Sequence, residues 1–141
     1  SKEYYLTAAV EIAYNNDLKI DLIQIDEQEI LGVNSREDLA LAEKIIQTKL
    51  RHFFLNKGVT LIDPETNYFS YDTIIKKDVT IFPNVFIGEG VKIDSGSSIL
   101  SFCHLENCYI KKNVSIGPFA RIRGNTVLNK NNKIGNFVEL K

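Results

Sequence analysis

The chain has 141 residues, of which 44% are hydrophobic and 25% charged, and its formal net charge is −1. This length suits one ordinary domain or two small ones, and the charge excludes the strongly basic surface of a typical nucleic-acid-binding protein. The apolar runs are far shorter than the ~18 residues that span a membrane, and the start of the chain shows no signal-peptide pattern. Two cysteines are too few for a disulfide framework. We therefore expect a cytoplasmic protein with no nucleic-acid or membrane partner.

The segment before residue 36 contains two short patterns. Residues 3–16 (EYYLTAAVEIAYNN) have a helical composition, and residues 18–26 (LKIDLIQID) alternate like a strand. These pieces are too short to fold well alone, so residues 1–35 are interpreted as the end of an α/β domain. The chain has no Met and ends after a patterned stretch without a turn or cap signal, so we expect a piece of a longer protein.

Residues 36–57 are predicted to form a long helix. Ser35 is a good N-cap, Asp38 completes a near capping box, and Gly58 stands where a C′ glycine belongs. An apolar stripe follows the helical spacing at Leu39, Ala42, Ile46, Leu50, Phe53 and Phe54. With a 1.5 Å rise per residue the helix is a rod of ~33 Å, which favours residues 36–58 as a connecting arm over a helix packed on its own domain.

The second half of the chain repeats every six residues. Apolar side chains recur at Phe69, Ile75, Ile81, Ile87, Ile93, Ile99, Leu105, Ile110, Ile116, Ile122, Leu128, Ile134 and Leu140, with a single five-residue step before Ile110. A smaller side chain stands two residues before each of them, from Asn67 to Val138. Turn-forming residues such as Pro83-Asn84 and Gly88-Glu89-Gly90 lie between these pairs.

A period of six is typical of a β-helix with a triangular cross-section. Residues i and i+2 of a strand face the same way, so the small residue and the aliphatic residue of each unit both face inward. Three sides make a coil of ~18 residues, which predicts about four coils over 67–141 within a β-helix domain at 59–141. The alternative is a β-sandwich, whose turns recur every ~8–12 residues. The period does not determine the hand of the coil.

The two cysteines and one histidine lie close together in this repeat. Cys103 and Cys108 both occupy small inward positions, which suit a buried thiol. His104 is interpreted as a surface residue, and the three together are a weak signal for a metal site.

Five blocks resemble one enzyme family, in the same order along the chain: EYYLT, ILGVNSREDLALAE, GVTLIDPETNYF, IGPFARIR and IGNFVELK. They are similar to the GlmU family, in which N-acetylglucosamine-1-phosphate uridyltransferase is fused to glucosamine-1-phosphate acetyltransferase. The resemblance covers essentially the whole chain. It implies a left-handed β-helix, an exception to the right-handed crossover rule.

The resemblance also implies a function. In this family a first domain joins UTP to N-acetylglucosamine-1-phosphate with Mg²⁺, and a β-helix forms a homotrimer and transfers acetyl from acetyl-CoA to glucosamine-1-phosphate. The chain would hold the end of the first domain, the arm and the first coils of the second. No catalytic residue of either reaction would lie in it, so we expect it to be inactive alone. A non-catalytic trimeric scaffold, and a single-function sugar-1-phosphate nucleotidyltransferase with a β-helix appendage, stay open as alternatives.

Three residues near the start match the family's first site. Asn34, in GVN, matches an asparagine that binds Mg²⁺ and touches the nucleotide sugar, and an amide oxygen is a suitable hard ligand. Without the resemblance, Asn34 is typical of a loop or cap asparagine. Tyr5 and Thr7, in EYYLT, match residues that line the sugar-phosphate pocket, although their pattern alone favours packing or surface roles. Ala8 stands where the family usually has Asp.

Arg123 and Lys141 are the predicted phosphate ligands of the β-helix. Both directly follow an inward aliphatic residue, so both point outward, and their 18-residue separation is one full coil. They are therefore expected to stack on one face and present two positive charges to a phosphate, whereas a lone cation would be solvated surface. The resemblance matches them to two cations of the acetyltransferase site. Gly124-Asn125 stands where the family often has Pro-Gly.

Overall fold

The computed structural model describes residues 5–26 and 29–141. The chain divides into two units, residues 1–32 and 33–141, and each is described by itself. The predicted domain boundaries at residues 35 and 58 stay predictions.

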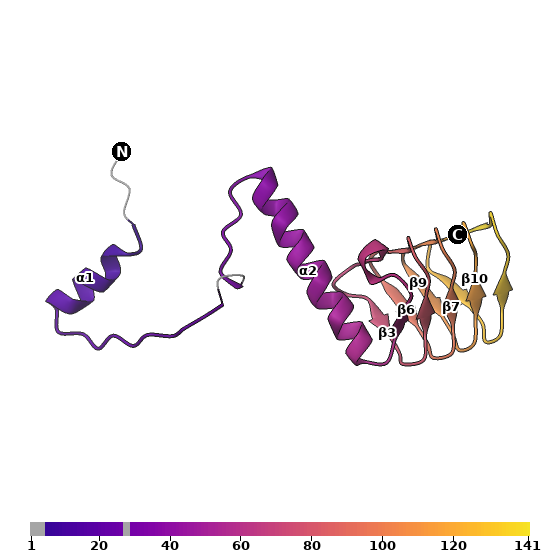
Figure 1. Cartoon of the computed structure of the whole chain (residues 1–141), viewed down its shortest axis with the longest axis horizontal. Helices are drawn as coiled ribbons and strands as arrows, with labels where there is room; N and C mark the ends of the chain where they lie inside the picture. The colour runs from indigo at the N-terminus through magenta and orange to yellow at the C-terminus, as the bar shows by residue number, and fades with distance from the viewer. Residues whose placement is uncertain (1–4, 27–28) are drawn as a thin grey trace. The chain divides into compact units, whose positions relative to one another are not determined.

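The first unit contains one helix, α1 (Ala8–Asn15), among its described residues (Figure 1). The helix covers only part of residues 5–16 of the predicted helix, whose residues 3 and 4 lie outside the described residues, and its N-cap Thr7 makes no side-chain capping bond. The strand predicted over residues 18–26 is wrong, because this segment forms no ladder. A strand is held by hydrogen bonds to a neighbouring strand, and the described part of this unit supplies none, so Leu22 and Ile23 stay almost fully exposed.

The second unit begins with the long helix α2 (Arg36–Asn56), and its predicted termini are confirmed. The Ser35 hydroxyl accepts a hydrogen bond from the Asp38 amide, and the Asp38 carboxylate accepts one from the Ser35 amide, which completes the capping box. Gly58 follows the helix with φ +82°, a conformation that glycine adopts readily.

Short strands make up the rest of the unit. They are β1 (Thr60–Leu61), β2 (Tyr68–Phe69), β3 (Ile74–Ile75), β4 (Thr80–Ile81), β5 (Phe86–Ile87), β6 (Val91–Ile93), β7 (Ser98–Ile99), β8 (His104–Leu105), β9 (Cys108–Ile110), β10 (Ser115–Ile116), β11 (Arg121–Ile122), β12 (Thr126–Leu128), β13 (Lys133–Ile134) and β14 (Glu139–Leu140). Each pairs in parallel with the strand three places along the chain, so three sheets form: β1-β4-β7-β10-β13, β2-β5-β8-β11-β14 and β3-β6-β9-β12. The coils stack one upon another beside α2 (Figure 1).

This arrangement is the predicted left-handed parallel β-helix, and it excludes the sandwich. The register follows the sequence period: Tyr68 pairs with Phe86, 18 residues later, whereas Ser98 pairs with Ser115, because the five-residue step shortens the coil by one residue. All thirteen predicted apolar positions face the interior. Eleven are buried, and Ile134 and Leu140, in the last coil, are partly buried because they are covered on one side only.

The first coil begins one strand earlier than residue 67, where the repeat was predicted to start. Val59 and Leu61 belong to the core, and Leu61 pairs with Ile81, 20 residues later. A short 3-10 helix (Pro64–Thr66) occupies this coil and adds two residues to it. The insertion breaks the six-residue period, so the sequence pattern did not reveal β1.

At many corners of the coils, one residue adopts the left-handed backbone conformation, with a positive φ. Gly90 and Gly96 adopt it without a Cβ penalty, and asparagines adopt it at several other corners. Three phenylalanines also do so, which the sequence pattern did not indicate: Phe102, Phe119 and Phe137, with φ of 62°, 59° and 55°. Their rings stack with centroids 4.9 and 5.1 Å apart, and this aromatic contact offsets part of the backbone cost.

Helix α2 covers the open end of the β-helix through its second half only. Phe54 is buried with its ring 4.9 Å from that of Phe69. The predicted apolar stripe is only partly confirmed, since Leu39, Ile46 and Phe53 are exposed. The first coil reaches only the later turns of the helix, where Phe54 is buried and Leu50 packs against the core. The polar side chain of Gln47 is buried in the contact instead.

An ion pair between an exposed Lys76 and a buried Asp94 joins two coils on the sheet that contains β3 and β6. Asp94, 7% exposed, lies 2.6 Å from the Lys76 Nζ and accepts a hydrogen bond of 2.8 Å from the Tyr109 hydroxyl. The Lys76 ammonium holds the pKa of Asp94 below its usual value, and Tyr109 adds to the effect.

We expect this ion pair to make stability depend on pH in acid. A carboxylate whose pKa is lower in the folded state stabilises the fold above its unfolded pKa of about 3.9, and this contribution is lost as the pH falls through the folded pKa. Asp94→Asn should therefore destabilise the protein at pH 7 and flatten the loss of stability below about pH 4. Urea unfolding at pH 7 and pH 3 measures both effects, and an unchanged acid slope in Asp94→Asn would contradict the assignment.

Candidate functional site

Two columns of outward side chains run along the sheet that contains β2, β5, β8, β11 and β14. The first column consists of the first residue of each strand: Tyr68, Phe86, His104, Arg121 and Glu139. The second consists of the residue after each strand: Ser70, Gly88, Glu106, Arg123 and Lys141. The amides of Ser70, Gly88, Glu106 and Arg123 each donate to the next coil, which keeps this column in register.

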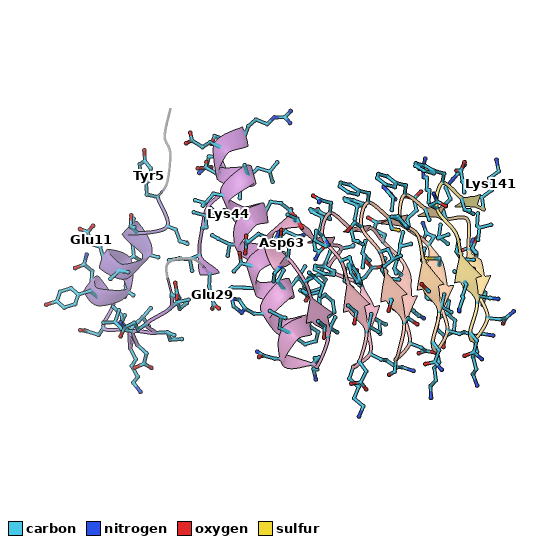
Figure 2. The ribbon with its side chains drawn as sticks, turned by 45° about the vertical axis from the view of Figure 1, so that its right-hand side comes forward. Tyr5, Glu11, Glu29, Lys44, Asp63 and Lys141 are labelled. Atoms are coloured by element: carbon cyan, nitrogen blue, oxygen red, sulfur yellow. The ribbon has the colours of Figure 1, made fainter. Side chains whose placement is uncertain are left out.

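The structure brings Arg123 and Lys141 together. Ile122 pairs with Leu140, and the Arg123 amide donates to the Leu140 carbonyl, so the two cations lie in neighbouring coils on one face. Figure 2 labels Lys141 at the last coil. Arg123 is half-buried and Lys141 is exposed, which leaves both cations within reach of a bound anion.

Each arginine of this face is paired with a carboxylate. The Arg123 Nε donates to Glu139 over 2.7 Å, and an Arg121 terminal nitrogen (Nη2) donates to Glu106 over 3.2 Å. The Arg123 guanidinium holds the pKa of Glu139 below its usual value, with smaller contributions from Arg121 and Lys141. The pKa of Glu106 is likewise lowered, chiefly by Arg121. Both carboxylates are therefore ionised at neutral pH.

Arg121, Glu106 and Glu139 were not among the residues predicted from the sequence. Their signal was available, because strand alternation places residues on both sides of an inward aliphatic residue on the outer face. Arg121 and Arg123 flank Ile122, and Glu139 and Lys141 flank Leu140. What the pattern could not show is which cation pairs with which carboxylate.

The other end of the same face is aromatic. The rings of Tyr68 and Phe86 stack with centroids 4.7 Å apart, and the His104 ring contacts Phe86 at a tilt, with centroids 4.6 Å apart. His104, predicted to be a surface residue, is in fact half-buried in this stack, with its Nε2 3.5 Å from Glu106. Cys103 and Cys108 are buried and unpaired, and burial raises the pKa of Cys108 to about 12, which makes this thiol a poor nucleophile at neutral pH.

The residues predicted for the first site lie in both units. Tyr5 and the α1 N-cap Thr7 are exposed in the first unit. Asn34 is exposed at the start of the second unit, where its backbone N–H donates to the Asp38 carboxylate over 3.1 Å. The Asp38 carboxylate accepts hydrogen bonds from two backbone N–H groups, so it is already engaged, and the side-chain oxygen of Asn34 is the remaining hard ligand at this position. The described residues contain no cluster of three His, Cys, Asp or Glu side chains able to hold a metal.

Comparison with known proteins shows which sequences share these features. A family model described as bacterial transferase hexapeptide (six repeats) matches residues 107–141, the stretch that contains Arg123, Glu139 and Lys141. Proteins named bifunctional protein GlmU match almost the whole chain: that of Wolbachia pipientis wMel is 52% identical over 139 residues, or 99% of this chain and 32% of the relative. Over this length the chain resembles a segment of the GlmU proteins.

Two further GlmU relatives agree. The protein of Gluconobacter oxydans is 50% identical, and that of Anaplasma marginale (strain Florida) 45% identical, each over 99% of this chain. The chain spans about a third of the length of the curated GlmU relatives it matches. No helix of the described residues is long and apolar enough to cross a membrane.

Proposed function

We propose that this chain is the central part of a bifunctional enzyme that makes UDP-N-acetylglucosamine. The observation that carries the proposal is the pair Arg123 and Lys141, one coil apart on one face, inside a segment that matches GlmU proteins. The β-helix half then transfers acetyl from acetyl-CoA to glucosamine-1-phosphate. The other half transfers uridylyl from UTP to the resulting N-acetylglucosamine-1-phosphate and releases pyrophosphate.

Arg123 and Lys141 bind the phosphate of glucosamine-1-phosphate in this proposal. Two cations in neighbouring strands lie about 4.8 Å apart along the stack, a spacing that allows both to reach one phosphate. A general base elsewhere in the whole enzyme takes a proton from the sugar ammonium. The free amine then attacks the thioester carbonyl and the C–N bond forms. The C–S bond breaks, and the leaving thiolate takes the proton that the amine nitrogen loses, which releases coenzyme A as its thiol. Residues 33–141 supply binding and orientation, and we expect no turnover from this chain alone.

Tyr5, Thr7 and Asn34 are assigned to the uridylyl-transfer site. Tyr5 and Thr7 bind the sugar phosphate, and the Asn34 amide oxygen is one ligand of a Mg²⁺ ion completed by phosphates and a carboxylate from the rest of the enzyme. When bound, Mg²⁺ neutralises the charge that develops on the phosphates.

We also assign the β-helix to a homotrimer in the cytoplasm. Its flat sides suit packing around a threefold axis, and its two buried free thiols suit a reducing compartment. Sedimentation equilibrium of the chain should give three times its 16.0 kDa mass, and a monomer at all concentrations would exclude this assignment.

Binding of glucosamine-1-phosphate to the chain tests the proposed function. We expect Arg123→Ala to weaken binding about tenfold or more, because a charge-assisted contact to phosphate is lost. Lys133→Ala is the matched control, because Lys133 is a cation of the last coil on a different sheet. Titration calorimetry or NMR measures both affinities, and equal losses in the two variants would refute the phosphate site.

A further inference from the structure

The two arginines of the outward face use their guanidinium groups differently. Arg121 bonds Glu106 through a terminal nitrogen (Nη2), whereas Arg123 bonds Glu139 through Nε. The described residues accept no hydrogen bond from Nη1 or Nη2 of Arg123. Arg123 therefore keeps its terminal fork, the pair of N–H groups that binds phosphate oxygens in a bidentate manner, while the fork of Arg121 is engaged.

We propose that Glu139 is a positioning residue, which holds Arg123 through Nε so that its terminal fork faces an incoming phosphate. This inference rests on the proposed phosphate site and deepens it. A free arginine side chain samples many rotamers, and binding must immobilise it. The bond from Glu139 fixes the guanidinium plane before the ligand arrives, so less conformational entropy is lost on binding.

Glu139 is itself held in place. It is the register partner of Arg121 in the next coil, and Arg121, Arg123 and Lys141 all favour its ionised form. The three cations Arg121, Arg123 and Lys141 outnumber the two carboxylates of this face, Glu139 and Glu106, by one positive charge. An anion that reaches the Arg123 fork therefore meets net attraction, even though Glu139 is negative.

The negative charge of Glu139 lowers the affinity for phosphate through repulsion, whereas its hydrogen bond to Arg123 raises that affinity by orienting the guanidinium. Because Arg123 and Glu139 are 35% and 49% exposed, water screens the repulsion. The two effects separate in two variants. Glu139→Gln keeps an oxygen acceptor for the Arg123 Nε and removes the charge, whereas Glu139→Ala removes both.

The test measures binding of inorganic phosphate to the chain by NMR titration. We expect Glu139→Gln to bind as tightly as the unmodified chain or up to about fivefold more tightly, because repulsion is lost. Glu139→Ala should bind about threefold or more weakly than Glu139→Gln, because Arg123 is no longer oriented. The Arg123 Nε–H signal should persist in Glu139→Gln and broaden through solvent exchange in Glu139→Ala.

Glu106 supplies the matched control. It lies in register with Arg123 in the preceding coil, and it carries the same charge but hydrogen-bonds Arg121 instead of the Arg123 Nε. Glu106→Gln and Glu106→Ala should therefore bind phosphate within about twofold of each other. The inference is overturned if Glu139→Ala binds as tightly as Glu139→Gln, or if the Glu106 pair shows the same difference.

The outcomes also separate this inference from the proposed function. If Arg123→Ala binds phosphate as tightly as the unmodified chain, the phosphate site itself is wrong and the inference falls with it. If Arg123→Ala weakens binding while the two Glu139 variants bind equally, the site stands and the positioning role of Glu139 is wrong.

Discussion

Replacing Gln47 by Leu is expected to destabilise residues 33–141 by about 2–4 kcal/mol, because two buried backbone groups lose their partners. Gln47 lies on α2 and is 5% exposed. Its amide nitrogen donates to the Phe69 carbonyl over 2.7 Å, and its amide oxygen accepts from the Phe69 N–H over 3.0 Å. One side chain thus replaces the backbone of a missing strand at the open edge of β2.

The physical reason is strand alternation. The backbone N–H groups of Tyr68 and Ser70 donate to the next coil. The backbone N–H and C=O of Phe69, between them, therefore point the opposite way, toward α2. Leu has a similar volume to Gln but cannot donate or accept a hydrogen bond. The substitution therefore preserves packing while leaving the N–H and C=O of a residue that is 1% exposed without partners.

Urea unfolding followed by circular dichroism measures the effect. Thr48→Val is the matched control, since the Thr48 hydroxyl bonds only the Lys44 carbonyl of its own helix turn. We expect that variant to change stability by about 0.5 kcal/mol or less. A cost below about 1 kcal/mol for Gln47→Leu would show that water or another group replaces the amide.

Ile99→Ala is expected to cost about 3–4 kcal/mol, because it leaves a cavity in the middle of the stacked core. Ile99 is fully buried in β7, and its register partners Ile81 and Ile116 lie in the coils on either side. The parallel strands hold both neighbours in place, so the core can collapse only partly around the missing atoms.

Ile134→Ala is the control within the same sheet. Ile134 is the register partner of Ile116 in the last coil and is only partly buried. We expect it to cost about 1 kcal/mol, since little transfer free energy and no enclosed cavity are involved. Equal costs for the two variants would mean that the coils unfold independently rather than as one cooperative unit.

Much of the fold was predictable because each local signal agreed with the others. The period of six predicted the inward column from Phe69 to Leu140, and Ser35, Asp38 and Gly58 marked the helix ends. The extended segment at 18–26 was not predictable as such, because alternation is compatible with a strand and only a partner strand makes one. The first coil was hidden because the 3-10 helix Pro64–Thr66 lies in it and the coil is two residues longer than the period.

The candidate site was predictable in part. Counting from Ile122 and Leu140 was enough to place Arg123 and Lys141 on one face, one coil apart. Their assignment to a phosphate came from a family resemblance and stays a prediction. The pairing of Arg123 with Glu139 lay outside any sequence pattern, because a long side chain can reach several neighbours and its rotamer is set by the charges around it.

The sequence by itself determined the repeating cross-section of this protein, since inward and outward positions follow from the period and from strand alternation alone. Only the tertiary structure decided how the open edge of the first coils is closed and which cation pairs with which carboxylate. Gln47 closes the edge at Phe69, and Glu139 holds Arg123 through Nε. Both contacts join residues from different turns or elements, and a polar side chain selects its partner by distance and direction in space.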